Sequence, residues 1–120
     1  MDYDVLIVGG GPAGLSSAIR LKQLCQENDA DISVCVLEKG SYVGAHILSG
    51  NVFEPKALNE LFPDWKERDA PLRTEVKSDT MKILSETGSF TLPNIFMPKS
   101  ISNHGNYIIS LSELTMWLNE

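Results

Sequence analysis

The 120-residue sequence has few cysteines and fewer basic than acidic residues, which argues against an iron–sulfur cluster held by this chain alone and against a nucleic-acid-binding protein. It has two cysteines, Cys25 and Cys35, whereas an iron–sulfur cluster usually takes four thiolate ligands, so the chain does not supply a cluster by itself. Ten basic residues stand against 16 acidic ones, and the formal charge is -6. A nucleic-acid-binding protein needs a clustered positive face, so this balance disfavours such a role.

Signals for export or membrane spanning are also missing. No run of about 18 apolar residues is present, which excludes a spanning helix within this sequence. The start, Met1-Asp2-Tyr3-Asp4, is acidic and leads straight into an apolar stretch, so we expect neither a signal peptide nor an Arg-rich presequence. No repeat or low-complexity tract interrupts the chain, and its length suits one small domain.

The first 38 residues predict a strand–helix–strand unit. Residues 4–8 form a continuous apolar run, typical of a parallel strand buried on both faces. Apolar residues then recur at helical spacing from Ala13 to Gln26, and a second apolar strand follows at 32–37. A strand, a glycine turn, a helix and a strand within about 35 residues make a right-handed βαβ unit. Cys25 and Cys35 fall in this helix and second strand, where we interpret both as small buried apolar side chains.

The turn between the first strand and the helix has the spacing Gly9-x-Gly11-x-x-Gly14. Alone this is a weak signal, but it follows a strand and opens a helix, as dinucleotide-binding folds require. Gly9 allows the tight turn, Gly11 lets a pyrophosphate approach the backbone, and Gly14 lets the helix pack closely on the strand. Pro12 suits the first helical turn. The pyrophosphate would then lie at the helix N-terminus, where free N–H groups favour an anion.

An acidic residue ends the second predicted strand. The carboxylate of Glu38 is placed to accept hydrogen bonds from the adenosine ribose, and it would repel a 2′-phosphate, which disfavours NADP. The N-terminal position of the turn and a second glycine-rich loop, at 40–50, favour FAD over NAD. The predicted fold class is therefore α/β, with a Rossmann-like βαβ FAD-binding domain.

The middle of the chain predicts a short helix and a hairpin. The helix covers 55–62, and its apolar stripe is typical of a face turned to a core. The stripe consists of Ala57, Leu58, Leu61, Phe62 and Trp65. Strand-like runs at 80–84 and 90–92 flank a turn at 85–89 and predict a hairpin.

Near the end of the sequence, Tyr107-Ile108-Ile109 predicts a strand, and Ser110 with Glu113 has the spacing of a capping box that opens a helix. That helix continues to the last residues without a C-terminal cap. Two or three strands of a parallel sheet also cannot cover their own faces. We therefore expect the domain to be incomplete at the C-terminus and the chain to be the N-terminal part of a longer polypeptide.

Beyond the glycine turn, the sequence resembles the family of electron transfer flavoprotein–ubiquinone oxidoreductases, flavoproteins of the glutathione-reductase type. The matching stretches are residues 8–16, 20–24, 37–39, 43–50, 60–67, 70–72 and 103–108. Those after residue 43 are more specific than the turn. Gly10 is a small departure, since related sequences often carry alanine there.

The resemblance implies a membrane-associated enzyme that accepts electrons from reduced electron transfer flavoprotein and passes them to ubiquinone. It implies one FAD and one [4Fe–4S] cluster, with the cluster ligands outside this chain. By position, Gly9 to Gly14 would hold the FAD pyrophosphate and Gly44 to Gly50 would lie along the flavin. The cofactor-binding residues expected on these grounds are Gly9, Gly11, Pro12, Ala13, Gly14, Glu38, Lys39, Gly44, Ala45, His46, Ser49 and Gly50.

The resemblance also bears on location and catalysis. It implies a membrane-surface segment at about 44–65, so the apolar stripe there is open to two interpretations, core packing or bilayer contact. Without a presequence, we expect the cytoplasmic face of a bacterial inner membrane, or the mitochondrial inner membrane in a eukaryote. We expect no catalytic side chain, because electron transfer through a flavin does not require one. His46 and His104 are isolated and would be structural on sequence grounds alone.

Two alternatives remain open. One is another FAD enzyme with the same nucleotide-binding unit, such as a geranylgeranyl reductase or a monooxygenase-like protein. Such enzymes would share the glycine turn and Glu38 but lack the stretches at 44–50 and 103–107. The other alternative is an inactive, truncated nucleotide-binding fragment.

Overall fold

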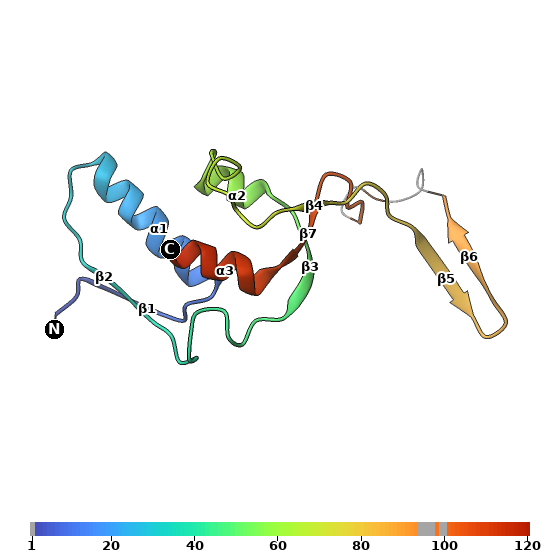
Figure 1. Cartoon of the computed structure of the whole chain (residues 1–120), viewed down its shortest axis with the longest axis horizontal. Coiled ribbons are helices and arrows are strands. Elements are labelled where there is room, and N and C mark those ends of the chain that lie inside the picture. The colour runs from blue at the N-terminus through green and yellow to red at the C-terminus, as the bar shows by residue number, and fades with distance from the viewer. Residues whose placement is uncertain (1, 94–97, 99–100) are drawn as a thin grey trace.

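A computed structural model describes residues 2–93, 98 and 101–120. The molecule is elongated, with extents of 63 × 30 × 23 Å, and one hairpin stands apart from the remaining elements (Figure 1). The strands are β1 (Val5–Val8), β2 (Val34–Leu37), β3 (Ser49–Phe53), β4 (Thr74–Glu75), β5 (Met81–Ser85), β6 (Gly88–Leu92) and β7 (Tyr107–Ser110). The helices are α1 (Pro12–Glu27), α2 (Lys56–Leu61) and α3 (Leu111–Asn119).

The predicted βαβ unit is confirmed. β1 and β2 pair in parallel with Val5 opposite Val34 and Val8 opposite Leu37, and α1 connects them. Pro12 occupies the first helical turn, where a missing N–H leaves no hydrogen bond unmade. The second strand begins two residues later than predicted, at Val34. The elements β1, α1 and β2 give the Rossmann-like start of an α/β domain.

The expectation that β1 is buried on both faces is wrong. Leu6 is 56% exposed and Val8 is 82% exposed, while Val5 and Ile7 are half-buried. α1 packs against the face that carries Val5 and Ile7, and no described element covers the opposite face. A parallel sheet is ordinarily covered on both faces, whereas the described residues leave the face with Leu6 and Val8 uncovered.

A second sheet lies beside α2 and α3 and has the order β3-β7-β4 (Figure 1). β7 pairs antiparallel with both neighbours, with Phe53 and Glu75 opposite Tyr107. The strand predicted at 107–109 and the helix predicted after it are confirmed. The capping prediction also holds in its first half, because the Ser110 hydroxyl accepts a hydrogen bond from the Glu113 N–H at 3.3 Å.

The core lies between this sheet, α2 and α3. Leu58 and Trp65, from the predicted apolar stripe, are 4% and 5% exposed and pack with Ile109 and Leu114. Trp65 also meets Tyr107 edge to face, with ring centroids 5.8 Å apart. The core-facing interpretation of these two stripe residues is therefore confirmed. Membrane contact by residues 44–65 stays a prediction.

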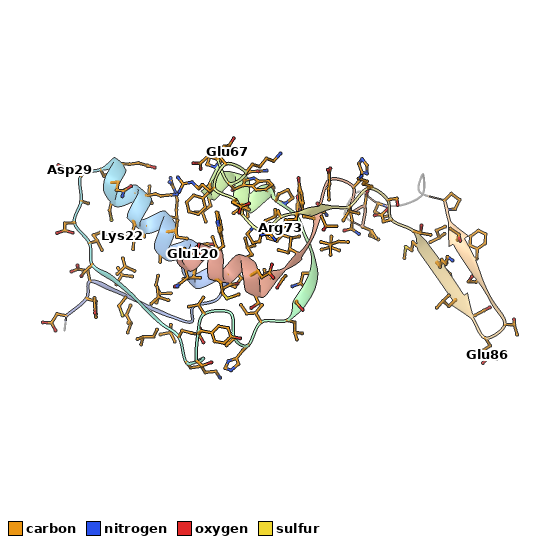
Figure 2. The ribbon with its side chains drawn as sticks, in the orientation of Figure 1. Lys22, Asp29, Glu67, Arg73, Glu86 and Glu120 are labelled. Atoms are coloured by element: carbon orange, nitrogen blue, oxygen red, sulfur yellow. The ribbon has the colours of Figure 1, made fainter. Side chains whose placement is uncertain are left out.

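The predicted hairpin is confirmed as β5–β6, with a turn of only two residues between Ser85 and Gly88. Glu86 lies at its tip, far from the helices (Figure 2). Ile83 is paired with Phe90, and both side chains are more than half exposed. The described residues therefore leave an apolar face of this hairpin uncovered. A two-stranded hairpin is only marginally stable by itself.

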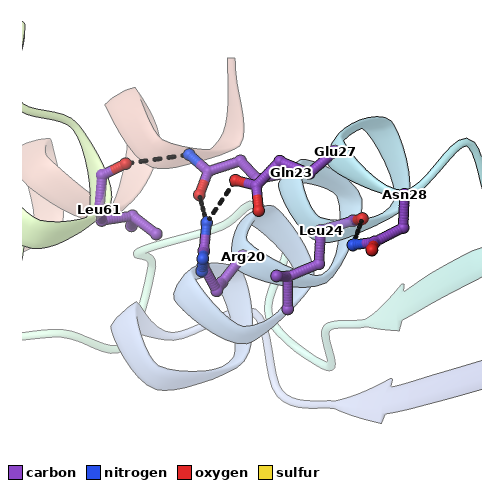
Figure 3. A network of polar contacts seen from close by, with 6 residues as sticks. All are labelled: Arg20, Gln23, Leu24, Glu27, Asn28 and Leu61. Atoms are coloured by element: carbon purple, nitrogen blue, oxygen red, sulfur yellow. Dashed lines mark hydrogen bonds and ion pairs between the residues drawn. The ribbon is translucent and has the colours of Figure 1, made fainter.

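A polar network links α1 to the end of α2 (Figure 3). The Gln23 side-chain amide donates to the Leu61 carbonyl oxygen at 2.9 Å, and Arg20 donates to Gln23 Oε1 at 3.2 Å and Glu27 Oε1 at 3.1 Å. The contact between Gln23 and Leu61 ties the nucleotide-binding unit to the rest of the core. Among the described residues, no helix has the length and apolar character needed to cross a membrane.

Candidate nucleotide-binding site

The glycine turn has the backbone geometry that its sequence predicts. Gly9 has φ +107°, a conformation that side-chain-bearing residues rarely adopt. Its N–H donates to the Leu37 carbonyl oxygen at 2.7 Å, which joins the turn to the end of β2. The turn and the residue after β2 therefore meet at the carboxyl edge of the parallel pair, where open α/β sheets bind ligands.

Gly11 and Gly14 differ in what surrounds them. A Cβ on Gly14 would overlap the Gly9 carbonyl oxygen and lie 3.2 Å from Ile7 Cγ2, so helix and strand pack too closely for a side chain. A Cβ on Gly11 would meet nothing within 4 Å. Gly11 is also the N-cap of α1 in extended conformation, and no side chain among the described residues caps the helix with a hydrogen bond there. The N-terminus of α1 is thus open to an anion that its N–H groups can bind.

Glu38 follows directly after β2 and bridges two loops. Its Oε2 accepts from the Gly10 N–H at 2.8 Å, and its Oε1 accepts from the Gly40 N–H at 2.6 Å. A carboxylate offers about four acceptor positions, so two remain for a ligand such as the vicinal hydroxyls of a ribose. The side chain is exposed, which leaves these positions accessible.

The same hydrogen bonds hold Glu38 in its charged form. The Gly40 N–H, and after it the Gly10 N–H, lower the pKa of the Glu38 carboxyl below the ordinary value, and the charge of His46 adds to the effect. The site consequently presents a negative charge beside the open helix end.

The loop predicted at 40–50 is shorter than expected, because Ser49 and Gly50 already belong to β3. Ahead of them, the Ala45 N–H donates to the Tyr42 carbonyl and the Ile47 N–H donates to the Gly44 carbonyl, which makes a tight turn. Gly44 is buried, and Ala45 is half-buried.

The remaining predicted residues lie at different depths around this turn. Lys39, His46 and Ser49 are exposed. Gly9 to Gly14 and Glu38 form one connected group, and His46 joins them by its electrostatic contact with Glu38. Whether the predicted residues contact a cofactor stays a prediction.

Two residues of the site escaped sequence reasoning. Val43 lies against Gly10 of the glycine turn, since a Cβ on Gly10 would be 3.3 Å from Val43 Cγ2. The Ser112 hydroxyl donates to the Gly44 carbonyl oxygen at 2.9 Å, across 68 positions of sequence. No local pattern marks a contact over such a separation. In the sequence, the only indication of a close approach at this point of the loop is the glycine at 44, next to the apolar Val43.

The two cysteines do not fit an iron–sulfur cluster. Cys25 is buried in α1 as predicted, whereas Cys35 on β2 is only half-buried, so the prediction of a buried side chain is wrong for Cys35. Two thiolates fall short of the usual four, and no group of three or more metal-ligating side chains occurs within residues 2–93, 98 and 101–120.

Comparison with known proteins agrees with this geometry. A family profile described as an NAD(P)-binding Rossmann-like domain matches residues 7–64. A Pseudomonas aeruginosa protein named electron transfer flavoprotein-ubiquinone oxidoreductase is 63% identical over 98% of the chain. The mitochondrial proteins of the same name from rice and Dictyostelium discoideum are 58% and 59% identical over 98% of the chain. The chain belongs to this family.

The family members are much longer than the chain, which spans 22%, 20% and 19% of the length of these three relatives. The resemblance drawn from the sequence is confirmed by these identities. The part of this chain that the Rossmann-like profile matches begins at Ile7 in β1 and ends beyond α2. It includes the glycine turn, Glu38 and the loop at 40–50.

Proposed function

We propose that this chain holds the adenine-dinucleotide end of FAD. The observation that carries the proposal is the connection of the glycine turn to Glu38, through the hydrogen bond from Gly10 N–H to Glu38 Oε2. It places an open helix N-terminus beside a carboxylate with free acceptor positions. The pyrophosphate lies at Gly11 and the first turn of α1, and the ribose hydroxyls donate to Glu38.

FAD fits this site better than NADP because of charge. The Gly40 N–H and then the Gly10 N–H lower the pKa of the Glu38 carboxyl, so the side chain is negatively charged at neutral pH. A 2′-phosphate on the ribose would bring a second negative group against it. The names of the relatives describe an oxidoreductase between a flavoprotein and ubiquinone, and such electron transfer supports FAD over NAD.

For the whole protein we propose an FAD-dependent oxidoreductase, an electron-transferring-flavoprotein dehydrogenase that passes electrons from reduced electron transfer flavoprotein to ubiquinone. The support is the identity to relatives bearing that name. Bound FAD supplies the redox chemistry. The residues of this chain bind and orient its adenosine end, and they hold a fixed negative charge at Glu38.

The wider setting of the enzyme belongs to the same proposal. The relatives' names include mitochondrial proteins. The apolar side chains exposed on β5–β6, together with Leu48 and Val52 within residues 44–65, are available for contact with a membrane surface. A [4Fe–4S] cluster, if bound, takes its ligands from outside this chain.

The test is to purify the protein expressed from its own complete gene and identify its cofactor. We expect one FAD per chain after acid release, and quinone reduction that depends on reduced electron transfer flavoprotein. Glu38→Ala should raise the Kd for FAD, whereas Glu86→Ala, at the hairpin tip, should not. Release of NAD or NADP in place of FAD would contradict the cofactor proposal. Quinone reduction that ignores the partner flavoprotein would contradict the proposed activity.

A further inference from the structure

The loop between β2 and β3 is fixed at both of its ends. At the start, the Gly40 N–H donates to Glu38 Oε1 at 2.6 Å. At the end, Ser49 enters β3 opposite Ser110, the last residue of β7. The loop therefore spans from the nucleotide-binding turn to the junction between β7 and α3.

A third contact holds the middle of the loop. The Gly44 carbonyl oxygen accepts both the Ile47 N–H, at 3.1 Å, and the Ser112 hydroxyl, at 2.9 Å. Gly44 has φ +91° and is buried, and a Cβ there would lie 2.9 Å from Ser112 Oγ and 3.0 Å from the Ser112 carbonyl oxygen. Real Cβ atoms essentially never show the first distance, the second is tighter than most, and the positive φ is itself strained for a side-chain-bearing residue. Glycine therefore lets the loop approach α3 this closely.

The support for this contact is rigid. Ser112 lies in the first turn of α3, which Ser110 caps through the Glu113 N–H. Two residues further on, Leu114 and Thr115 are 2% and 0% exposed, and the Thr115 hydroxyl donates to the Leu111 carbonyl at 2.7 Å. The start of α3 is thus held in the core by its cap and by buried side chains, and the loop contacts it through Ser112.

We propose that Ser112 is a positioning residue for the cofactor, acting through its contact with Gly44. This inference rests on the proposed function, and on the position along the flavin that the family resemblance implies for residues 44–50. Glu38 and the glycine turn bind the adenosine end, and Ser112 sets where the loop meets the other end. The contact links the affinity and orientation of the flavin to α3, an element far away in sequence.

The experiment uses the protein from its complete gene with three variants, Ser112→Ala, Gly44→Ala and Gly105→Ala. Gly105 is the matched control, since it has φ +84° and a Cβ there would meet nothing within 4 Å. The strain of a left-handed alanine is common to both glycine variants, so their difference isolates the approach to Ser112. Each protein is titrated with FAD, and the visible circular dichroism of the bound flavin is recorded as the measure of its orientation.

We expect Ser112→Ala to raise the Kd for FAD about fivefold, the equivalent of about 1 kcal/mol for a net hydrogen bond. Gly44→Ala should raise it by at least about tenfold. Both should change the flavin circular dichroism, and Gly105→Ala should change neither quantity. If Ser112→Ala leaves both unchanged, or if Gly44→Ala matches Gly105→Ala, the inference is overturned while the proposed function stands. A wild-type protein that binds no FAD would overturn both.

Discussion

Gly14 lies so close to Gly9 that a single methyl group on Gly14 would overlap the Gly9 carbonyl oxygen. The obstructing atom is backbone, and Gly9 is itself held by its hydrogen bond to Leu37. Neither side of the contact can yield cheaply, so the turn depends on the missing side chain at Gly14.

Gly14→Ala should therefore destabilise the protein even though alanine favours helices more than glycine does. Overpacking of this kind costs about 1–3 kcal/mol, against a helix-propensity gain of up to about 1 kcal/mol. Denaturant unfolding would measure the change. Gly88→Ala is the control, because a Cβ at that position meets nothing within 4 Å, and its effect should stay within about 0.5 kcal/mol. Equal stability of the two variants would show that the close contact has no consequence.

Gly11→Ala should separate ligand binding from stability. The backbone of Gly11, at φ -81° and ψ 179°, is open to any residue, and a Cβ there has no protein neighbour within 4 Å. The free energy of unfolding without ligand should change by less than about 0.5 kcal/mol. FAD affinity should fall by at least about tenfold, because the methyl group would occupy the path of the pyrophosphate. Unchanged affinity would remove Gly11 from the binding site.

The contribution of Glu38 to stability should depend on pH with a defined sign. Hydrogen bonds from Gly40 and then Gly10 lower the pKa of its carboxyl in the folded state. A lowered pKa stabilises the fold fully above the unfolded value, 4.5, and the benefit is lost as the pH falls through the folded value. The stability difference between wild type and Glu38→Ala, measured by urea unfolding, should thus be constant near pH 7 and shrink below pH 4.5.

Two other carboxyl groups, those of Asp4 and Asp64, also make stability depend on pH, but their effect cancels when wild type is compared with Glu38→Ala. The Ser33 hydroxyl lowers the pKa of Asp4, and Arg68 lowers that of Asp64, but both are present in wild type and variant and cancel in the difference. A stability difference that grows towards acid would contradict the assignment for Glu38.

The isolated 120-residue polypeptide should bind FAD weakly and show no quinone reductase activity. Leu6, Val8 and Leu37 of β1 and β2 are at least half exposed, so the described residues leave one face of the sheet that carries the glycine turn uncovered. A parallel pair without cover holds its turn poorly. Spectroscopic titration with FAD and an assay with reduced electron transfer flavoprotein would measure both properties. Purification of the segment with stoichiometric yellow flavin would contradict this expectation.

The local elements followed from the sequence because their signals are local. The glycine turn, the start of α1 at Pro12 and the Ser110 cap each depend on residues within five positions of one another. Hydrophobic periodicity placed β1, α1 and α2 to within one or two residues. The role of Glu38 as a strand-end acid at the turn also followed, since the βαβ unit brings both strand ends to one edge.

Tertiary structure alone decided how these elements meet. The pairing of β3 with β7, the burial of Leu58 and Trp65, and the hydrogen bond from Ser112 to Gly44 join residues that lie dozens of positions apart. The tertiary structure also decided that Glu38 bridges two loops, because these hydrogen bonds depend on the positions of the Gly10 and Gly40 N–H groups in the fold. The residues set the local chemistry through short-range sterics and hydrogen bonding. Contacts between distant elements could not be predicted in this way, because the burial of a residue depends on neighbours that are far away in the sequence.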